Sequence, residues 1–251
     1  MHSLRDFVTN NKYLLVAHRG SSGVAPENTL IAYQKAIEEG SDMIEMDVQV
    51  TSDNHLVTYH DFIPFGFNKD INNLTYDELQ KIDVGIGYDI QFKNTRIPLL
   101  EQALELIQNK NYLMIEIKTI AINNFKNNSK ILIDLIKKYD YIDKTLIGSF
   151  NLQALSNIKK DYPEIHTAAI KIPGDNRLPS EIKKIVNCDA YICSFEELNE
   201  KLVNDAIEND LFVGVYSIDT KSQLIEVLNY KIKAIATNYP KKVRQWLDEI
   251  K

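Results

Sequence analysis

The stretch MIEMDVQV, residues 43–50, indicates what kind of sheet this chain builds. Side chains on a strand alternate between its two faces, so Ile44 and Met46 share one face. The opposite face carries the carboxylates of Glu45 and Asp47. We expect the apolar face to pack against helices and the carboxylates to point into the interior of a closed barrel.

Similar apolar runs recur along the 251 residues and alternate with segments of helical periodicity. Eight strand–helix units in a chain of this length are typical of a (β/α)8 barrel, an α/β fold of the TIM-barrel type. An open, doubly wound sheet is the alternative. The predicted strands are Tyr13–Ala17, Met43–Val50, Tyr112–Ile117, Thr145–Ser149, His166–Ile170, Ala190–Cys193, Phe212–Tyr216 and Ala234–Ala236. The predicted helical segments begin at Leu30 and stop at Gly40, lie around 100–107 and 131–136, and follow at 152–160, 180–186, 198–207, 222–228 and 241–250.

The connection that follows Asp61 is too long for an ordinary barrel loop, and long ordered loops are often functional. Thr75 and Glu78 have the spacing of a capping box, which predicts a short helix inside this connection. We expect one catalytic domain over residues 1–251, with residues 62–98 inserted over the strand ends after the second strand.

Composition excludes several classes of protein. The 29 basic and 35 acidic residues give a net charge of −6, which argues against a nucleic-acid partner. No run of about 18 apolar residues predicts a transmembrane segment, and the first residues lack the pattern of a signal peptide. Cys188 and Cys193 are not spaced as a CxxC pair and fit reduced thiols. We therefore expect a cytoplasmic protein without a nucleic-acid partner; the sequence does not indicate an oligomeric state.

Barrels of this type place their catalytic groups at the carboxyl ends of the strands, so polar residues there are candidates for a site. The first strand runs directly into His18 and Arg19, for which a helix cap or a salt bridge is the alternative role. The third strand, YLMIEIK at 112–118, places Glu116 and Lys118 on one face.

Glu45, Asp47 and Glu116 would bring three carboxylates together inside the barrel. Buried carboxylates are costly and repel one another unless a positive charge lies between them. A divalent cation meets this need, and carboxylate oxygens suit Mg²⁺ or Ca²⁺. A structural ion pair with arginine or lysine is the alternative. Lys118 lies one step nearer the strand end, where it is placed to meet an anion.

A hairpin is predicted in VTSDNHLVTYHD, residues 50–61, because Asp53-Asn54 is a two-residue turn signal. A turn centred there pairs Asp47 with His60 and so predicts a second histidine beside the carboxylates. The histidines expected outside the site are His2, His55 and His166.

Two histidines, three carboxylates, an arginine and a lysine thus meet at one end of the predicted barrel. Two histidines can serve as general base and general acid. A cation and two basic side chains can hold and polarise a phosphoryl group. The combination predicts phosphodiester hydrolysis.

These motifs closely resemble those of the glycerophosphodiester phosphodiesterase family, and the similarity covers nearly the whole chain. The family's usual order is a strand into HRG, then PENT, then ExD on the next strand and a hairpin to HD. The matching segments are His18-Arg19-Gly20, Pro26-Glu27-Asn28-Thr29, Glu45-Met46-Asp47 and His60-Asp61, followed by IPLLEQAL (97–104), EIK (116–118) and SFN (149–151).

The resemblance implies a barrel with a small insertion that hydrolyses glycerophosphodiesters to sn-glycerol 3-phosphate and an alcohol with one divalent cation, Mg²⁺ or Ca²⁺. The site residues it implies are Glu45, Asp47 and Glu116 for the metal, His18 and His60 for acid/base catalysis, and Arg19, Lys118, Phe150 and Tyr216 for the phosphate or substrate.

Three segments depart from the family's pattern. The usual Trp-Thr-Val-Asn of the seventh strand is Tyr216-Ser217-Ile218-Asp219 here, and the usual Thr-Asp at the end of the last strand is Thr237-Asn238. The segment FIPFGFN, 62–68, replaces a basic one in the loop expected over the leaving group.

Two other functions fit the same site. A lysophospholipase D-like enzyme would need an apolar ramp, which the insertion could supply unless these side chains pack the insertion onto the barrel. The side chains concerned are Phe62, Ile63, Phe65 and Phe67. A non-catalytic phosphate-ligand binding protein is the other alternative.

Overall fold

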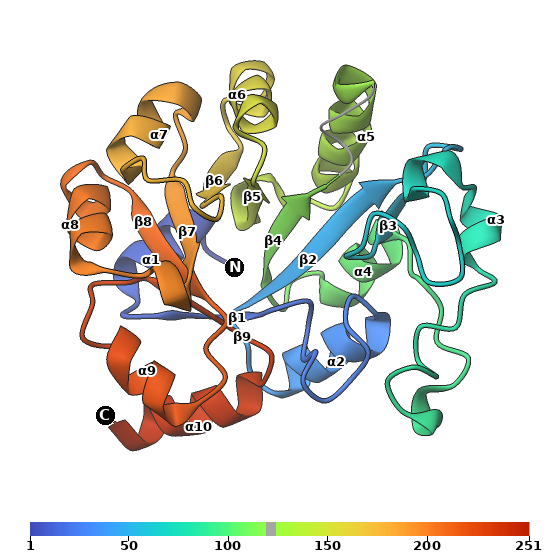
Figure 1. Cartoon of the computed structure of the whole chain (residues 1–251), viewed down its shortest axis with the longest axis horizontal. Helices are drawn as coiled ribbons and strands as arrows, with labels where there is room; N and C mark the ends of the chain where they lie inside the picture. Colours follow the sequence, from blue (N-terminus) through green and yellow to red (C-terminus); the bar gives the residue numbers. More distant parts are fainter. Residues whose placement is uncertain (119–123, 251) are drawn as a thin grey trace.

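Eight parallel strands close into a barrel in the computed structural model, which describes residues 1–118 and 124–250 (Figure 1). The barrel closes because β1 pairs with both β2 and β9. The predicted (β/α)8 architecture is thus confirmed. The strands are β1 (Leu14–Ala17), β2 (Met43–Val50), β3 (Leu56–Thr58), β4 (Tyr112–Ile117), β5 (Thr145–Ser149), β6 (His166–Ile170), β7 (Ala190–Ser194), β8 (Phe212–Tyr216) and β9 (Ala234–Thr237).

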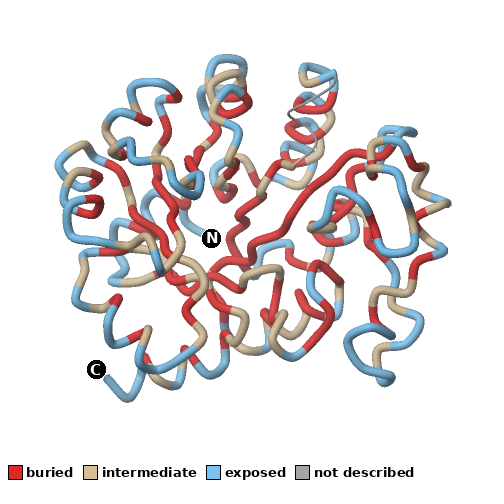
Figure 2. Tube along the Cα trace, in the orientation of Figure 1, coloured by how far each residue is buried: buried red, intermediate tan, exposed pale blue. Residues whose placement is uncertain are grey.

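Helices surround the barrel, and their inner faces are buried while their outer faces are exposed (Figure 2). The α-helices are α1 (Leu4–Asn10), α2 (Leu30–Glu38), α3 (Tyr76–Leu79), α4 (Leu100–Ile107), α5 (Phe125–Lys138), α6 (Leu152–Asp161), α7 (Pro179–Val186), α8 (Glu200–Glu208), α9 (Lys221–Val227) and α10 (Pro240–Ile250). Short 3₁₀ turns lie at Ile71–Asn73, Ile90–Phe92, Ile142–Lys144 and Phe195–Glu197.

The two faces of β2 divide as predicted. Ile44 and Met46 are fully buried in the apolar cluster that the helices share with the outside of the barrel. Met43, on the opposite face, joins a second apolar cluster inside the barrel. In the parallel pairing of β2 with β4, Asp47 lies beside Glu116, so the register alone brings two of the predicted carboxylates together.

The hairpin between β2 and β3 has a different register from the one predicted. Val48 pairs with Thr58, and the backbone N–H of Tyr59 donates to the carbonyl of Asp47, so Asp47 faces Tyr59 and not His60. The loop contains three residues, 52–54, since the backbone N–H of Thr51 donates to the carbonyl of His55. Asn54 has a positive φ of 64°, whereas Asp53 lacks the positive φ that a two-residue type I′ turn would also require there. A three-residue loop with a left-handed last residue shifts the pairing by one position relative to a two-residue turn.

The amino-terminal helix α1, which the sequence did not predict, covers the amino-terminal ends of the strands. Leu4 and Val8 belong to the apolar cluster inside the barrel. The ring of Phe7 lies 4.8 Å from that of Tyr112, and the Lys233 ammonium donates to the carbonyl of Val8. The chain's amino terminus therefore lies over the middle of the barrel (Figure 1).

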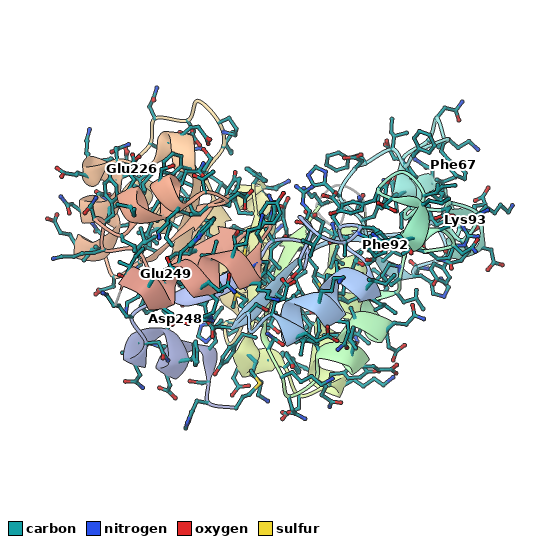
Figure 3. The ribbon with its side chains drawn as sticks, turned by 90° about the horizontal axis from the view of Figure 1, so that it is seen from below. Phe67, Phe92, Lys93, Glu226, Asp248 and Glu249 are labelled. Atoms are coloured by element: carbon teal, nitrogen blue, oxygen red, sulfur yellow. The ribbon has the colours of Figure 1, made fainter. Side chains whose placement is uncertain are left out.

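Residues 62–98 form a lobe with its own small apolar cluster beside β3. Thr75 and Glu78 form the predicted capping box at the start of α3. Figure 3 shows Phe67, Phe92 and Lys93 in this lobe, at the opposite side of the molecule from Glu226 and the end of α10. Among the residues that the structure describes, no helix has both the length and the apolar composition needed to cross a membrane.

Candidate active site

The first strand delivers His18 and Arg19 through a tight backbone bend at its carboxyl end. Arg19 and Gly20 both have positive φ angles, 55° and 79°. A side chain at Gly20 would place its Cβ 2.7 Å from the backbone carbon of Ala32, so only glycine fits this close approach to α2. The bend turns the backbone N–H of Arg19 toward Glu45, whose Oε2 accepts it at 2.8 Å.

Three carboxylates gather at the ends of β2 and β4. Glu45, Asp47 and Glu116 each offer an oxygen, and these oxygens lie within 4.8 Å of one another. Glu45 and Asp47 are almost fully buried, and the Glu116 side chain is 12 % exposed. Such a cluster requires positive charge close by.

Two cationic side chains contact the cluster. The Lys118 ammonium lies 2.8 Å from Glu116 Oε1 and 3.1 Å from Asp47 Oδ1. The guanidinium of Arg19 places Nε 3.2 Å from Asp47 Oδ2 and also pairs with Glu27 at 2.9 Å. The predicted phosphate-binding residues and carboxylates therefore lie together at one end of the barrel.

The charges shift the pKa values of the three carboxyls unequally. Burial and the neighbouring carboxylates of Asp47 and Glu116 hold the pKa of Glu45 well above its ordinary value. Burial and Asp47 raise the pKa of Glu116 to about 7. Burial also acts to raise the pKa of Asp47, but Lys118 and Arg19 outweigh it and lower that pKa. Asp47 thus bears the negative charge most readily, and the carboxyls of Glu45 and Glu116 ionise less readily than ordinary ones.

The cluster suits a divalent cation. Its donors are carboxylate oxygens, which Mg²⁺ and Ca²⁺ prefer. The two nearby cations leave the set short of positive charge, because Arg19 divides its charge between Asp47 and Glu27. Glu45, Asp47 and Glu116 therefore fit the expected metal, and their chemistry does not distinguish Mg²⁺ from Ca²⁺.

Asn28, in the PENT segment, orients Asp47. Its amide nitrogen donates to Asp47 Oδ2 at 2.8 Å, and its amide oxygen accepts the backbone N–H of Asp47 at 3.1 Å. Tyr33 on α2 donates to the same amide oxygen. The sequence predicts no role for Asn28 beyond its place in the PENT motif. Its position two residues before the start of α2 is the one signal that the sequence offers.

His18 is partly buried between the carboxyl ends of β1, β8 and β9. Its Nδ1 is 2.9 Å from the amide oxygen of Asn238 and 3.5 Å from the Ser217 hydroxyl. Its ring stacks on that of Tyr216 with centroids 6.2 Å apart. Burial and the adjacent Arg19 charge lower the pKa of His18. The imidazole is therefore predominantly neutral near pH 7.

His60 lies at the other side of the site, after β3. It lines a cavity of about 470 Å³ together with Glu116, Lys118 and Phe150. Its Nδ1 is 2.8 Å from the carboxylate of Asp61. Gln49 supports this segment by donating its amide to the carbonyls of Tyr59 and Asp61, at 2.9 and 2.8 Å. These bonds bring His60 to the site although the predicted pairing with Asp47 was wrong.

His55 and His166 lie outside the site, as predicted. His55 pairs with Asp53 in the hairpin loop, and His166 lies 3.7 Å from Asp189 at the opposite end of the barrel.

Comparison with known proteins identifies the family. The model of the glycerophosphoryl diester phosphodiesterase family matches residues 18–242. The chain belongs to this family. It is therefore an enzyme of the predicted class. A glycerophosphodiester phosphodiesterase of Caldanaerobacter subterraneus subsp. tengcongensis is 33 % identical over 238 residues, which cover 91 % of this chain and 95 % of that protein.

Two further relatives extend the comparison. The human lysophospholipase D GDPD1 is 33 % identical over 164 residues, which cover 60 % of this chain and 49 % of that protein. The structure of an Oleispira antarctica phosphodiesterase in complex with the product sn-glycerol-3-phosphate has the same fold, with a TM-score of 0.87 and 24 % identity. That superposition covers 96 % of this chain and 99 % of the other.

Proposed function

We propose that this family member is a metal-dependent phosphodiester hydrolase that cleaves glycerophosphodiesters to sn-glycerol 3-phosphate and an alcohol. The observation that carries the proposal is the buried group of three carboxylates with Arg19 and Lys118 against it and a histidine at each side. The product named for the Oleispira antarctica phosphodiesterase supports the choice of product.

In this proposal Glu45, Asp47 and Glu116 hold one divalent cation, Mg²⁺ or Ca²⁺. When bound there, it would supply a Lewis acid for a phosphoryl oxygen. Arg19 and Lys118 are already aimed at this point by their contacts with Asp47, and they compensate the remaining phosphate charge without reorganisation.

Proton transfer falls to His18 and His60. One removes a proton from the nucleophile, and the other protonates the leaving alcohol oxygen. The nucleophile is water or the substrate's own glycerol hydroxyl, which would give a cyclic phosphate that is then opened. Phe150 and Tyr216 form apolar walls beside the two histidines.

The acid/base assignment predicts that His18→Ala and His60→Ala each lower kcat by about 10²- to 10⁴-fold. His55→Ala is the matched control, because His55 is half exposed and pairs with Asp53 in the hairpin loop. Steady-state hydrolysis of glycerophosphocholine, with folding checked by circular dichroism, measures the effect. Rates near that of the unsubstituted protein in both variants would remove the two histidines from the mechanism.

A substrate panel tests the function itself. Glycerophosphocholine, glycerophosphoethanolamine, glycerophosphoglycerol and lysophosphatidylcholine would each be assayed with Mg²⁺, with Ca²⁺ and with EDTA. We expect hydrolysis that EDTA abolishes and one of the two metals restores. Binding of these compounds with no hydrolysis in any condition would instead support a phosphate-ligand binding protein.

A second candidate function, lysophospholipase D-like hydrolysis, is favoured by the surface beside His60. Phe62, Ile63 and Phe65 are 49 %, 50 % and 85 % exposed, so these three side chains do not pack the insertion onto the barrel. Phe67, by contrast, packs against the insertion's own apolar cluster. The name of the human relative points to the same class of substrate.

Phe65→Ser separates the two functions. If lysophospholipid is a substrate, this change should raise its KM several-fold, because about 0.8 kcal/mol of binding is lost for each buried methylene-sized contact. The KM for glycerophosphocholine should stay the same. Ile225→Ser, at a position on α9 that is 52 % exposed and lies outside the insertion, is the control for the loss of an exposed apolar side chain. Equal KM values for lysophosphatidylcholine in all three proteins would exclude the apolar ramp.

We also propose that the whole chain is one catalytic domain in which residues 62–98 form the insertion. The cluster of Ile71, Leu74 and Leu79 supports treating this lobe as a unit attached to the barrel. Cys188 and Cys193 are free and buried, which supports a reducing, cytoplasmic location.

A further inference from the structure

His60 borders two cavities of different chemistry. One is the cavity of about 470 Å³ described above, which Glu116 and Lys118 also line. The other, of about 490 Å³, lies between the loop after β1 and the insertion lobe, and this volume is typical of sites for small molecules. In the proposed function the phosphoryl group lies beside Lys118, so a group attached to it can extend past His60 into the second cavity.

The second cavity is acidic. The carboxylates of Glu27, Asp61 and Asp83 line it, and none of its lining residues in the described part of the chain is a lysine or an arginine. Glu27 is compensated by its ion pair with Arg19. Asp61 and Asp83 form no ion pair with a lysine or an arginine among the described residues, so their charges act on whatever enters the cavity.

Backbone hydrogen bonds keep Asp83 ionised and in place. Its Oδ1 accepts the N–H groups of Gly85 and Ile86, both at 3.1 Å, and its Oδ2 accepts the N–H of Asn94 at 2.7 Å. The bond from Asn94 is the largest cause that lowers the pKa of Asp83 below its ordinary value. A carboxylate offers about four acceptor sites, so one stays available to a ligand.

Two tyrosine rings join the carboxylates. Tyr59 and Tyr88 line the same cavity, and the ring of Tyr88 is held by a T-shaped contact with Phe92, with centroids 5.5 Å apart. Tyr88 is still 44 % exposed, so a ligand can reach its ring. Aromatic rings attract cations, and they are a common means of binding quaternary ammonium groups. Phe65 is 85 % exposed and contributes only at the edge of the cavity.

We propose that this cavity is the subsite for the leaving alcohol and that it selects alcohols with a positive charge, such as choline or ethanolamine. Asp61 and Asp83 attract the cation, and Tyr59 and Tyr88 contact its ammonium group. The proposal rests on the proposed function and deepens it by naming the class of substrate. It applies to both candidate functions, because glycerophosphocholine and lysophosphatidylcholine release the same choline.

Two substrates that differ in charge but not in shape test this selection. Glycerophosphocholine ends in a trimethylammonium group, and the ester of glycerol phosphate with 3,3-dimethylbutanol has a neutral carbon in place of that nitrogen. Because the two esters also differ in intrinsic reactivity, the measured quantity is the change in the ratio of their kcat/KM values, here called the charge preference. The charge preference should decrease at high salt, since salt screens exposed charges. A charge preference that does not change with salt would contradict the role of the two carboxylates.

Ile86→Lys places a cation in the cavity without removing any backbone bond to Asp83. Ile86 lines the cavity and is 50 % exposed. We expect the charge preference to fall about 5-fold or more, because like charges within a few ångströms of each other repel. Ile90→Lys is the matched control, since Ile90 is 69 % exposed in the same lobe but does not line the cavity. Equal charge preferences in the two variants would overturn the placement of the leaving alcohol.

The aromatic contribution is tested at Tyr88. Tyr88→Leu should lower the charge preference about 2- to 5-fold, which corresponds to an exposed cation–π contact. Tyr88→Phe keeps the ring and should keep the charge preference. An equal loss in both variants, or no loss in either, would refute the role of this ring.

Binding of choline separates a failure of this inference from a failure of the proposed function. In ¹⁵N-labelled protein, choline should shift the amide signals of Asp61, Asp83 and Tyr88 more than 3,3-dimethylbutanol does. No shift at these residues would refute the subsite even if glycerophosphocholine is hydrolysed. Binding of choline there without hydrolysis of any glycerophosphodiester would confirm the cation-selective cavity and refute the proposed function.

Discussion

The two ends of the barrel interior have opposite chemistry although the same strands build both. On the inward face of β2, apolar Met43 is followed by Glu45 and Asp47. On β4, Met114 is followed by Glu116 and then by Lys118 beyond the strand end. Two residues along each strand therefore separate an apolar interior, which encloses a cavity of about 70 Å³, from a charged site.

Residues that contribute to stability and residues that contribute to function therefore lie at opposite ends of the same strands. The amino-terminal half holds apolar side chains sealed by α1, and its packing contributes to folding. The carboxyl-terminal half holds three buried acidic groups whose mutual repulsion opposes folding and is only partly offset by Arg19 and Lys118. Substitutions at the two ends should therefore differ in which property they change.

The largest effect is expected at the charged end, from Glu116→Gln. Activity should fall by more than about 100-fold, since a ligand contributes at least as much as the residues that orient it. In EDTA the same change should stabilise the protein at pH 8. The pKa of Glu116 is raised to about 7, so its ionised form destabilises the fold increasingly as pH rises from about 4.5.

Urea denaturation in EDTA between pH 5 and pH 8 measures this. The difference between Glu116→Gln and the unsubstituted protein should grow with pH, and Glu249→Gln, which loses an exposed ion pair with Lys221, should show little change. A variant that is less stable than the unsubstituted protein at every pH would contradict the idea of repulsion at this end.

At the apolar end, Met43→Ala should lower the free energy of unfolding by about 2–5 kcal/mol, because it opens a cavity in a fully buried cluster. The kcat per folded molecule should be preserved. Ile225→Ala, at a half-exposed position, should stay within about 0.5 kcal/mol. If Met43→Ala lost activity far beyond its folded fraction, the two ends would not be separable.

A smaller effect is expected from Asp189→Asn, also at the amino-terminal end. Burial acts to raise the pKa of Asp189, but hydrogen bonds from His166, the N–H of Thr167 and Lys159 outweigh it and lower the pKa to about 2. Its ionised form therefore stabilises the fold above pH 4, and this contribution disappears as pH falls through about 2.

Asp189→Asn should thus destabilise the protein by about 1–2 kcal/mol at pH 7. The difference in the free energy of unfolding between the variant and the unsubstituted protein should shrink below pH 4. Urea denaturation at pH 7 and at pH 3 measures it. A constant difference at pH 7 and pH 3 would mean that shape, and not charge, accounts for the loss.

The strands were predictable to within one residue because each is an apolar run bounded by polar residues. α1 was missed because Leu4 and Val8 give it only two buried positions, too few for a clear helical period. The hairpin register was wrong because Asp53-Asn54 suits a two-residue turn as well as a three-residue loop. The two differ in the backbone of Asp53, which lacks the positive φ of a type I′ turn, and sequence alone does not show this.

The charged residues of the site stood out in the sequence because carboxylates on an inward face are unusual. Asn28 and Asn238 did not, since an amide at a strand end is common in loops and its importance lies in what it contacts. The carboxylate of Asp219 accepts the amide nitrogen of Asn238 from 19 residues away, and no local pattern links the two. Sequence reasoning thus finds buried charge more readily than the neutral groups that orient it.

The position of α1 over the strand starts bears on how substrate and products reach and leave the enzyme's site. Leu4 and Val8 pack over the strand starts and join the apolar cluster inside the barrel, at the end opposite the carboxylates. In the proposed function, substrate therefore arrives and both products depart at the carboxyl-terminal end, where His18 and His60 lie. A product that dissociates slowly from that end blocks the next substrate, so in the proposed reaction sn-glycerol 3-phosphate should act as a competitive inhibitor.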